Sequence, residues 1–209
     1  MPELTAPRRR RRRTDAERSA NAILHAAVEI LATQPNASVE DIATAAGVSR
    51  QTVYAHFKTR EALINAVIDA ITREAVAEMD AARLDEGPAA EALLRLLDAS
   101  WRTLRRYPLI LGVATQSADA EADHHRHRAV ADHLDRVLTR GRQSGEFAGD
   151  LNARWLGTAI ISLGHAAGDA VRTEQLPLDE ATTALARSVL RICGVNPRTI
   201  TKLVDATPR

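Results

Sequence analysis

The chain contains little of what would favour a β-rich, membrane-spanning or secreted protein. Aromatic residues make up only 3% of its 209 residues, and no run alternates apolar and polar β-type side chains. No stretch approaches the roughly 20 apolar residues that a membrane helix needs. The N-terminal arginines have no apolar segment behind them, so no signal peptide is expected.

Cysteine and catalytic motifs are equally scarce. Cys193 is the single cysteine, which excludes an internal disulfide and is compatible with the reducing cytoplasm. We expect it to be a small buried side chain, with a redox sensor as the alternative. The sequence has no nucleophile–base pattern, P-loop or glycine-rich dinucleotide fingerprint. These absences predict a protein that is not an enzyme, and no cofactor is expected.

Helix-forming residues dominate what is present, and they predict an all-α fold. The net charge of +1 is unevenly divided. Residues 1–60 carry ten basic and six acidic side chains, a balance of +4, so the remainder carries −3. A basic N-terminal end on a mildly acidic body favours a polyanionic partner for that end.

Residues 38–63 have the spacing of two short helices joined by a tight turn. Ser38 is suited to cap the first helix, with Asp41 at its third position. Gly47 falls where a helix ends on a left-handed residue, and Ser49 is suited to cap the next helix. Apolar residues of the first helix recur at the spacing of one buried face, at Val39, Ile42, Ala43 and Ala46.

The second helix, expected over residues 50–56, hides Val53 and Phe57 and presents donor-rich side chains to solvent. Side chains of this kind reach base edges and phosphates when a helix enters the major groove of DNA. The outward residues are Arg50, Gln51, Thr52, Tyr54 and His56.

The complete string closely resembles the DNA-binding domain of TetR-family transcriptional regulators. Its signature is matched by Ile42, Ala43, Ala46, Gly47, Val48, Ser49, Tyr54, His56 and Phe57. The resemblance implies a nine-helix architecture and a homodimer that binds a palindromic operator. It implies release by a small effector and, most often, repression, while activation stays open. The implied DNA contacts are Ser38, Ser49, Arg50, Gln51, Thr52, Tyr54, His56, Lys58 and Thr59.

Four segments are expected along the chain. Residues 1–13, with six consecutive arginines, are predicted to be a disordered arm that follows the DNA backbone or enters a minor groove. A solvated tail is the alternative. Arg11, Arg12 and Arg13 are the expected contacts of the arm. The helix-turn-helix domain covers 14–59, the effector-binding and dimerisation body 60–194, and a flexible tail 195–209. The boundary falls within the long helix that begins after Thr59.

Further helices are expected over 15–33, 60–84, 89–106, 109–118, 121–144, 150–173 and 179–192, with Asp150 capping the eighth. In that eighth helix the glycines fall on one stripe, and a mid-helix glycine costs about 1 kcal/mol relative to alanine. Close packing of another helix would compensate. The resemblance implies a four-helix dimer interface there, at Gly157, Ile161, Gly164, Gly168, Ala184, Leu185, Ser188, Val189 and Ile192. Packing within one chain is the alternative.

The body is expected to enclose a pocket for a hydrophobic or aromatic effector, if it follows the family plan. The candidate lining residues are Trp101, Leu104, Tyr107, Ile110, Leu111, Thr115, Gln116, Trp155 and His165. Simple core packing is the alternative for both tryptophans.

Two other functions are weighed beside the regulator. His124, His125, His127 and His133 suggest a metal site, with His124 and His127 three residues apart. The string DHHRHR is strongly charged and stands at a helix start, so a solvated surface is expected and no metal site is predicted. The other alternative is a non-specific architectural DNA-binding protein that uses the arginine arm.

Overall fold

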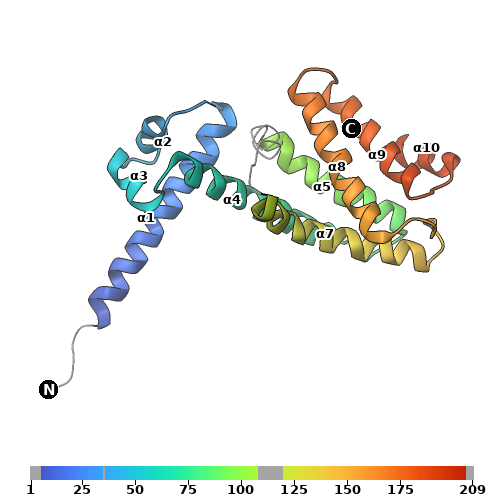
Figure 1. Cartoon of the computed structure of the whole chain (residues 1–209), viewed down its shortest axis with the longest axis horizontal. Coiled ribbons are helices and arrows are strands. Elements are labelled where there is room, and N and C mark those ends of the chain that lie inside the picture. The colour runs from blue at the N-terminus through green and yellow to red at the C-terminus, as the bar shows by residue number, and fades with distance from the viewer. Residues whose placement is uncertain (1–5, 35, 108–119, 206–209) are drawn as a thin grey trace. The chain divides into compact units, whose positions relative to one another are not determined.

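The structure is a computed structural model that describes residues 6–34, 36–107 and 120–205; within these, the side chains of 6–15, 104 and 120–127 are not described. Every regular element in the described residues is a helix, which confirms the predicted all-α fold (Figure 1). The chain divides into two compact units, Met1–Ile71 and Thr72–Arg209. We call them the head and the body.

The head contains α1 (Ala6–Thr33), α2 (Val39–Ala45), α3 (Arg50–His56) and the first half of α4 (Arg60–Ala81). Ile23, Ala27 and Leu31 of α1 are buried at one-turn intervals, as their spacing predicts. The compact unit ends at Ile71, twelve residues beyond the nominal boundary at Thr59, because the first half of α4 is buried through Leu63, Val67, Ile68 and Ile71.

The arginine run does not form the disordered arm that its composition predicts. Residues 8–13 lie within α1, which begins at Ala6. Arginine is a good helix former, so a helix anchored through Ile23, Ala27 and Leu31 continues toward the N-terminus through the run. The side chains of Arg11, Arg12 and Arg13 lie outside the described residues.

The body contains the rest of α4 with α5 (Ala89–Arg106), α7 (Ala120–Gln143), α8 (Ala153–Arg172), α9 (Leu178–Ile192) and α10 (Pro197–Asp205). Its core is formed by large apolar side chains from all of these helices, including Met79, Leu93, Leu134, Leu156 and Leu190. In Figure 1, α8 and α9 lie side by side. The helix expected over 109–118 lies outside the described residues.

Two local predictions about the body are wrong. Asn152, not Asp150, caps α8, because the Asn152 Oδ1 atom accepts hydrogen bonds from the backbone N–H groups of Arg154 and Trp155. The supposed flexible tail contains α10, in which Ile200 is 2% exposed. Leu203 and Val204 also pack against the core, and this apolar face gives a short helix the burial that holds it in place.

Candidate nucleic-acid interface

The start of α2 is fixed by a complete capping box. The backbone N–H and the hydroxyl of Ser38 both donate to Asp41 Oδ2, at 2.7 Å each. In return, the Asp41 N–H donates to Ser38 Oγ at 3.2 Å. These bonds from Ser38 lower the pKa of Asp41, so the carboxylate stays charged at the positive end of the helix. The capping role predicted for Ser38 and Asp41 is confirmed.

The turn between α2 and α3 is a Schellman motif. Gly47 has φ of +67°, a left-handed conformation that glycine adopts without steric cost. The Gly47 N–H bonds the carbonyl of Thr44 at 3.1 Å, and the Val48 N–H bonds that of Ala43 at 3.0 Å. These two bonds satisfy the last carbonyls of α2 and set the direction in which α3 leaves the turn.

Helix α3 begins at a serine cap and buries one face. Ser49 Oγ accepts from the Thr52 N–H at 3.1 Å, as predicted. Val53 is 1% exposed and anchors the helix, whereas Phe57 is only half-buried and serves as the C-cap. The side chains of Arg50, Gln51 and Ala55 are exposed, and those of Thr52, Tyr54 and His56 are half-buried.

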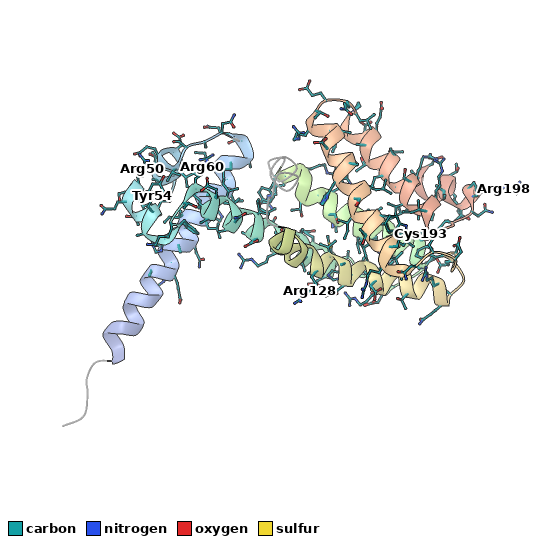
Figure 2. All side chains as sticks on the ribbon, in the orientation of Figure 1. Arg50, Tyr54, Arg60, Arg128, Cys193 and Arg198 are labelled. Atoms are coloured by element: carbon teal, nitrogen blue, oxygen red, sulfur yellow. The ribbon has the colours of Figure 1, made fainter. Side chains whose placement is uncertain are left out.

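Two of the outward side chains on α3 are held by neighbours. The Arg50 guanidinium lies over the Tyr54 ring, 5.5 Å from its centroid (Figure 2). Tyr54 also raises the pKa of Arg50, which therefore stays charged. The Thr52 hydroxyl is 2.9 Å from Ser49 Oγ. Arg50 and Thr52 are thus oriented within the head before any ligand is bound.

The beginning of α4 is held against the loop that precedes α2. Thr59 Oγ1 accepts from the Ala62 N–H at 3.1 Å and caps α4. Arg60 Nη1 donates to the carbonyl of Ala37 at 2.7 Å, across 23 residues of sequence. Sequence reasoning missed this role of Arg60, because nothing near it in the chain identifies a carbonyl so distant. Lys58, two residues before Arg60, is exposed.

The predicted effector-pocket residues have different environments. Trp101 and Tyr107 are buried, and the Tyr107 hydroxyl donates to Glu74 Oε2 at 3.0 Å. Trp155 is 63% exposed, and His165 is half-buried. The side chains of Leu104, Ile110, Leu111, Thr115 and Gln116 lie outside the described residues.

Sequence reasoning missed Thr103, whose buried hydroxyl has no partner among the described residues. Two hollows of the body, about 500 and 740 Å³, contain none of the predicted pocket residues. Charged side chains line much of both, including Arg95 and Asp98 in the first and Asp135 and Arg142 in the second.

The predicted dimer residues also differ in exposure. Leu185, Val189 and Gly168 are already buried within their own chain. Gly157 and Gly164 are half-buried, and a Cβ atom built on either meets no atom within 4 Å. The remaining members retain accessible surface: Ile161, Ser188 and Ile192 are half-buried and Ala184 is exposed.

No group of three or more potential metal ligands gathers among the described residues. The side chains of His124, His125 and His127 lie outside them. His133 is 5% exposed and contacts Asp80 through Nε2 at 3.3 Å and Arg136 through Nδ1. Since the Arg136 guanidinium can only donate, Nδ1 accepts and Nε2 carries the hydrogen that faces Asp80. His133 therefore links α7 to α4.

Cys193 is 1% exposed, as expected for a core side chain. Burial raises the pKa of its thiol to about 12, despite the opposing charge of Arg142. A thiol with so little thiolate character reacts slowly with oxidants, which argues against the redox-sensor alternative. No helix within the described residues is long and apolar enough to cross a membrane.

Comparison with known proteins agrees with the geometry of the head. Residues 23–67 match the family model described as bacterial regulatory proteins of the tetR family. The head of this chain is therefore similar to that of TetR-family regulators. The predicted resemblance to this family and the predicted all-α architecture are confirmed. The matched proteins are regulators, which agrees with the prediction that the chain is not an enzyme.

The TetR-family relatives include the HTH-type transcriptional repressor LfrR of Mycolicibacterium smegmatis, which is 37% identical over 83 residues. That match covers 40% of this chain and 44% of LfrR, so the chain aligns with less than half of this curated relative.

Solved structures of transcriptional regulators match most of the chain in fold. LfrR of Mycobacterium smegmatis in complex with proflavine has a TM-score of 0.64 and 25% identity, covering 84% of this chain and 96% of the other. FadR of Bacillus subtilis in complex with stearoyl-CoA has a TM-score of 0.66 and 23% identity, covering 84% and 98%. The second likeness shows the fold alone.

Proposed function

We propose that this protein is a sequence-specific DNA-binding transcriptional regulator whose α3 enters the major groove. The observation that carries the proposal is the way in which α3 is held in the head. A Schellman turn and a serine cap fix the helix, and Val53 anchors it while polar side chains remain outside. Lys58 and the capping residues Ser38, Ser49 and Thr59 lie close in sequence to α3 and are proposed to meet the DNA backbone, with His56 beside them.

Repression is the proposed sign of regulation, and the palindromic operator follows from a proposed homodimer. The name of LfrR as a repressor supports the first point. Two heads related by two-fold symmetry would meet two half-sites in successive major grooves. Open space at the Cβ positions of Gly157 and Gly164 supports a dimer face on α8, because no helix of the described residues packs closely enough there to compensate for two mid-helix glycines.

The proposed effector is a small, largely hydrophobic molecule held in the body. Trp101 and Tyr107 would supply apolar surface, and the unpartnered hydroxyl of Thr103 would supply a polar contact. Proflavine, the ligand in the LfrR structure, has a large aromatic ring system, which supports this class. An effector that binds the released conformation better by a few kcal/mol would shift the protein off its operator. The proposed place of action is the cytoplasm.

Selection from a pool of random DNA duplexes tests the specific function against the architectural alternative. A specific regulator should enrich one palindromic motif and bind it at least about 10³-fold more tightly than scrambled DNA at physiological salt. An architectural protein should bind both alike, through phosphates alone. Equal affinity for the two DNAs would contradict the proposal.

A further inference from the structure

The outward face of α3 has a centre and two flanks, defined relative to buried Val53. At 100° per residue, Gln51 and Ala55 each lie about 160° from Val53 around the helix axis. Arg50 and Tyr54 lie on one flank, and Thr52 and His56 lie on the other. The exposure of the side chains follows this geometry except at Arg50: Gln51 and Ala55 are exposed and Thr52, Tyr54 and His56 are half-buried, whereas Arg50 is exposed although it lies on a flank.

The flanking side chains are already engaged within the head. Arg50 lies over the Tyr54 ring, and the Thr52 hydroxyl is hydrogen-bonded with Ser49 Oγ. These contacts hold both side chains in one orientation. Gln51 differs, because its amide has no partner in the part of the chain that the structure describes.

The chemistry at the centre of this face matches A·T base pairs. A glutamine amide pairs with adenine in the major groove, accepting from N6–H and donating to N7. The methyl group of alanine contacts the methyl group of thymine. Gln51 and Ala55 are one turn apart, so both side chains can enter the same stretch of groove.

We propose that Gln51 reads an adenine in each half-site and that Ala55 contacts a neighbouring thymine methyl, while Arg50 and Thr52 orient the helix without choosing bases. This inference rests on the proposed DNA-reading function and narrows it to named bases. Arg50, held over Tyr54, directs its charge to a phosphate. Ala55 carries no polar group, so a search for donor-rich side chains does not find it.

Binding selections with three proteins test the adenine. The wild type should enrich an A·T pair at one position of each half-site. Gln51→Ala should lose the preference there by about 5- to 150-fold and keep the rest of the motif. Gln51→Arg should select guanine at the same position, because arginine pairs with O6 and N7 of guanine. An unchanged motif in both variants would overturn the inference and leave the proposed function standing, whereas a wild type that enriches no motif overturns both.

Modified DNA provides a test that does not depend on how a variant folds. Replacing the selected adenine with 7-deazaadenine removes the N7 acceptor, and should weaken the wild type but not Gln51→Ala. Replacing the neighbouring thymine with uracil removes only the methyl group, and should weaken the wild type through Ala55. If 7-deazaadenine left the affinity of the wild type unchanged, the Gln51 contact would be contradicted. If uracil left it unchanged, the Ala55 contact would be contradicted.

Two matched variants test the flanking roles. Thr52→Val keeps the shape of the side chain and removes its hydroxyl, and Arg50→Ala removes the charge over Tyr54. Both should lower affinity while selecting the wild-type motif. Lys58→Ala is the phosphate-contact control and should weaken all sequences alike. A changed base preference in Thr52→Val or Arg50→Ala would show that a flank reads bases and would overturn the assignment.

Discussion

At the scale of single residues, charged side chains far apart in sequence complete the ends of the body helices. Helix α5 begins after Pro88, which has no side-chain cap to offer. Glu146 supplies the cap from the loop that follows α7, accepting from the N–H groups of Ala89 at 3.0 Å and Ala90 at 3.1 Å. Arg95 acts at the opposite kind of terminus, where it donates to the carbonyls of Ala82, Arg83 and Glu86 after α4.

Replacing Glu146 with glutamine should destabilise the body by about 1 kcal/mol, because the charge that caps two backbone N–H groups is removed. Burial raises the pKa of Glu146, but the bonds from Ala89, Ala90 and Ser144 outweigh it and the net pKa lies below 4.5. The stabilisation is therefore present above about pH 4.5 and is lost as pH falls through the folded-state value.

Urea unfolding of both proteins across pH 3–7 measures this difference, with the approximate range set by the ordinary pKa of glutamate. The gap in stability between wild type and Glu146→Gln should narrow toward the acid end. Glu86→Gln is the matched control, since the carboxylate of Glu86 makes an exposed pair with Arg83 at 3.7 Å and caps no helix in the described residues. A gap of the same size at every pH would show that the Glu146 charge does not cap α5.

At the scale of secondary-structure elements, the helix ends depend on glycines whose surroundings differ. Gly47 and Gly194 both have positive φ, +67° and +77°. A Cβ atom on Gly47 would meet nothing within 4 Å, whereas one on Gly194 would lie 2.5 Å from the Cβ atom of Ala148. The same substitution therefore separates conformational strain from a steric clash.

Gly47→Ala should cost about 1 kcal/mol, from the left-handed conformation alone. Gly194→Ala should cost about 2 kcal/mol or more, because overpacking against Ala148 adds to the same strain. Tryptophan fluorescence isolates the body, where both tryptophans lie, and hydrogen exchange of α2 and α3 reports on the head. If Gly47→Ala and Gly194→Ala lost the same stability, the loop around Ala148 would have moved to make room for the added Cβ atom.

At the scale of the whole molecule, the proposed function requires two features outside the reading helix. One is a second copy of the chain, which would supply the second head. The other is positive charge beyond α3, which the sequence concentrates in residues 8–13 at the start of α1. Each can be removed while α2 and α3 are left unchanged.

Gly164→Leu should reduce both the dimer fraction and operator affinity. A Cβ atom here meets no atom of the described residues within 4 Å, so a loss of dimer and of operator binding would point to a second copy packed on α8. Overpacking between two helices costs about 1–3 kcal/mol, enough to shift a dimer toward monomer at low concentration. Analytical ultracentrifugation and circular dichroism should show more monomer with helix content unchanged. A fully dimeric variant with normal operator binding would place the interface elsewhere.

Deleting residues 1–13 should flatten the salt dependence of operator binding and keep the selected motif. Each arginine–phosphate contact that is lost should reduce the slope of log K against log salt concentration by about 0.9. Fluorescence anisotropy at several salt concentrations measures the slope for full-length and shortened protein. An unchanged slope would mean that the arginine run is solvated and does not bind DNA.

Predictions from sequence succeeded where the signal and its partner lie within a few residues of each other. The Ser38–Asp41 capping box, Gly47 and the Ser49 cap are all local, so their residue types alone indicate the geometry. Prediction failed where two neighbouring residues could each cap the same helix, and where a helix is buried against segments distant in the sequence. Asn152 rather than Asp150 caps α8, and Ile200 turns an expected tail into a helix.

The sequence by itself determined the all-α class, the helix-turn-helix and the set of residues from which α3 presents its outward face. Helix periodicity and capping act within about one or two turns, so the types of neighbouring residues are enough to predict them. Only the tertiary structure decided which side chains on that face are already engaged, that Trp155 is exposed, and that Arg60 and Glu146 bind backbone groups 23 and 56–57 residues away. Those outcomes depend on which segments meet in space, because the sequence around a residue does not identify a partner far away in the chain.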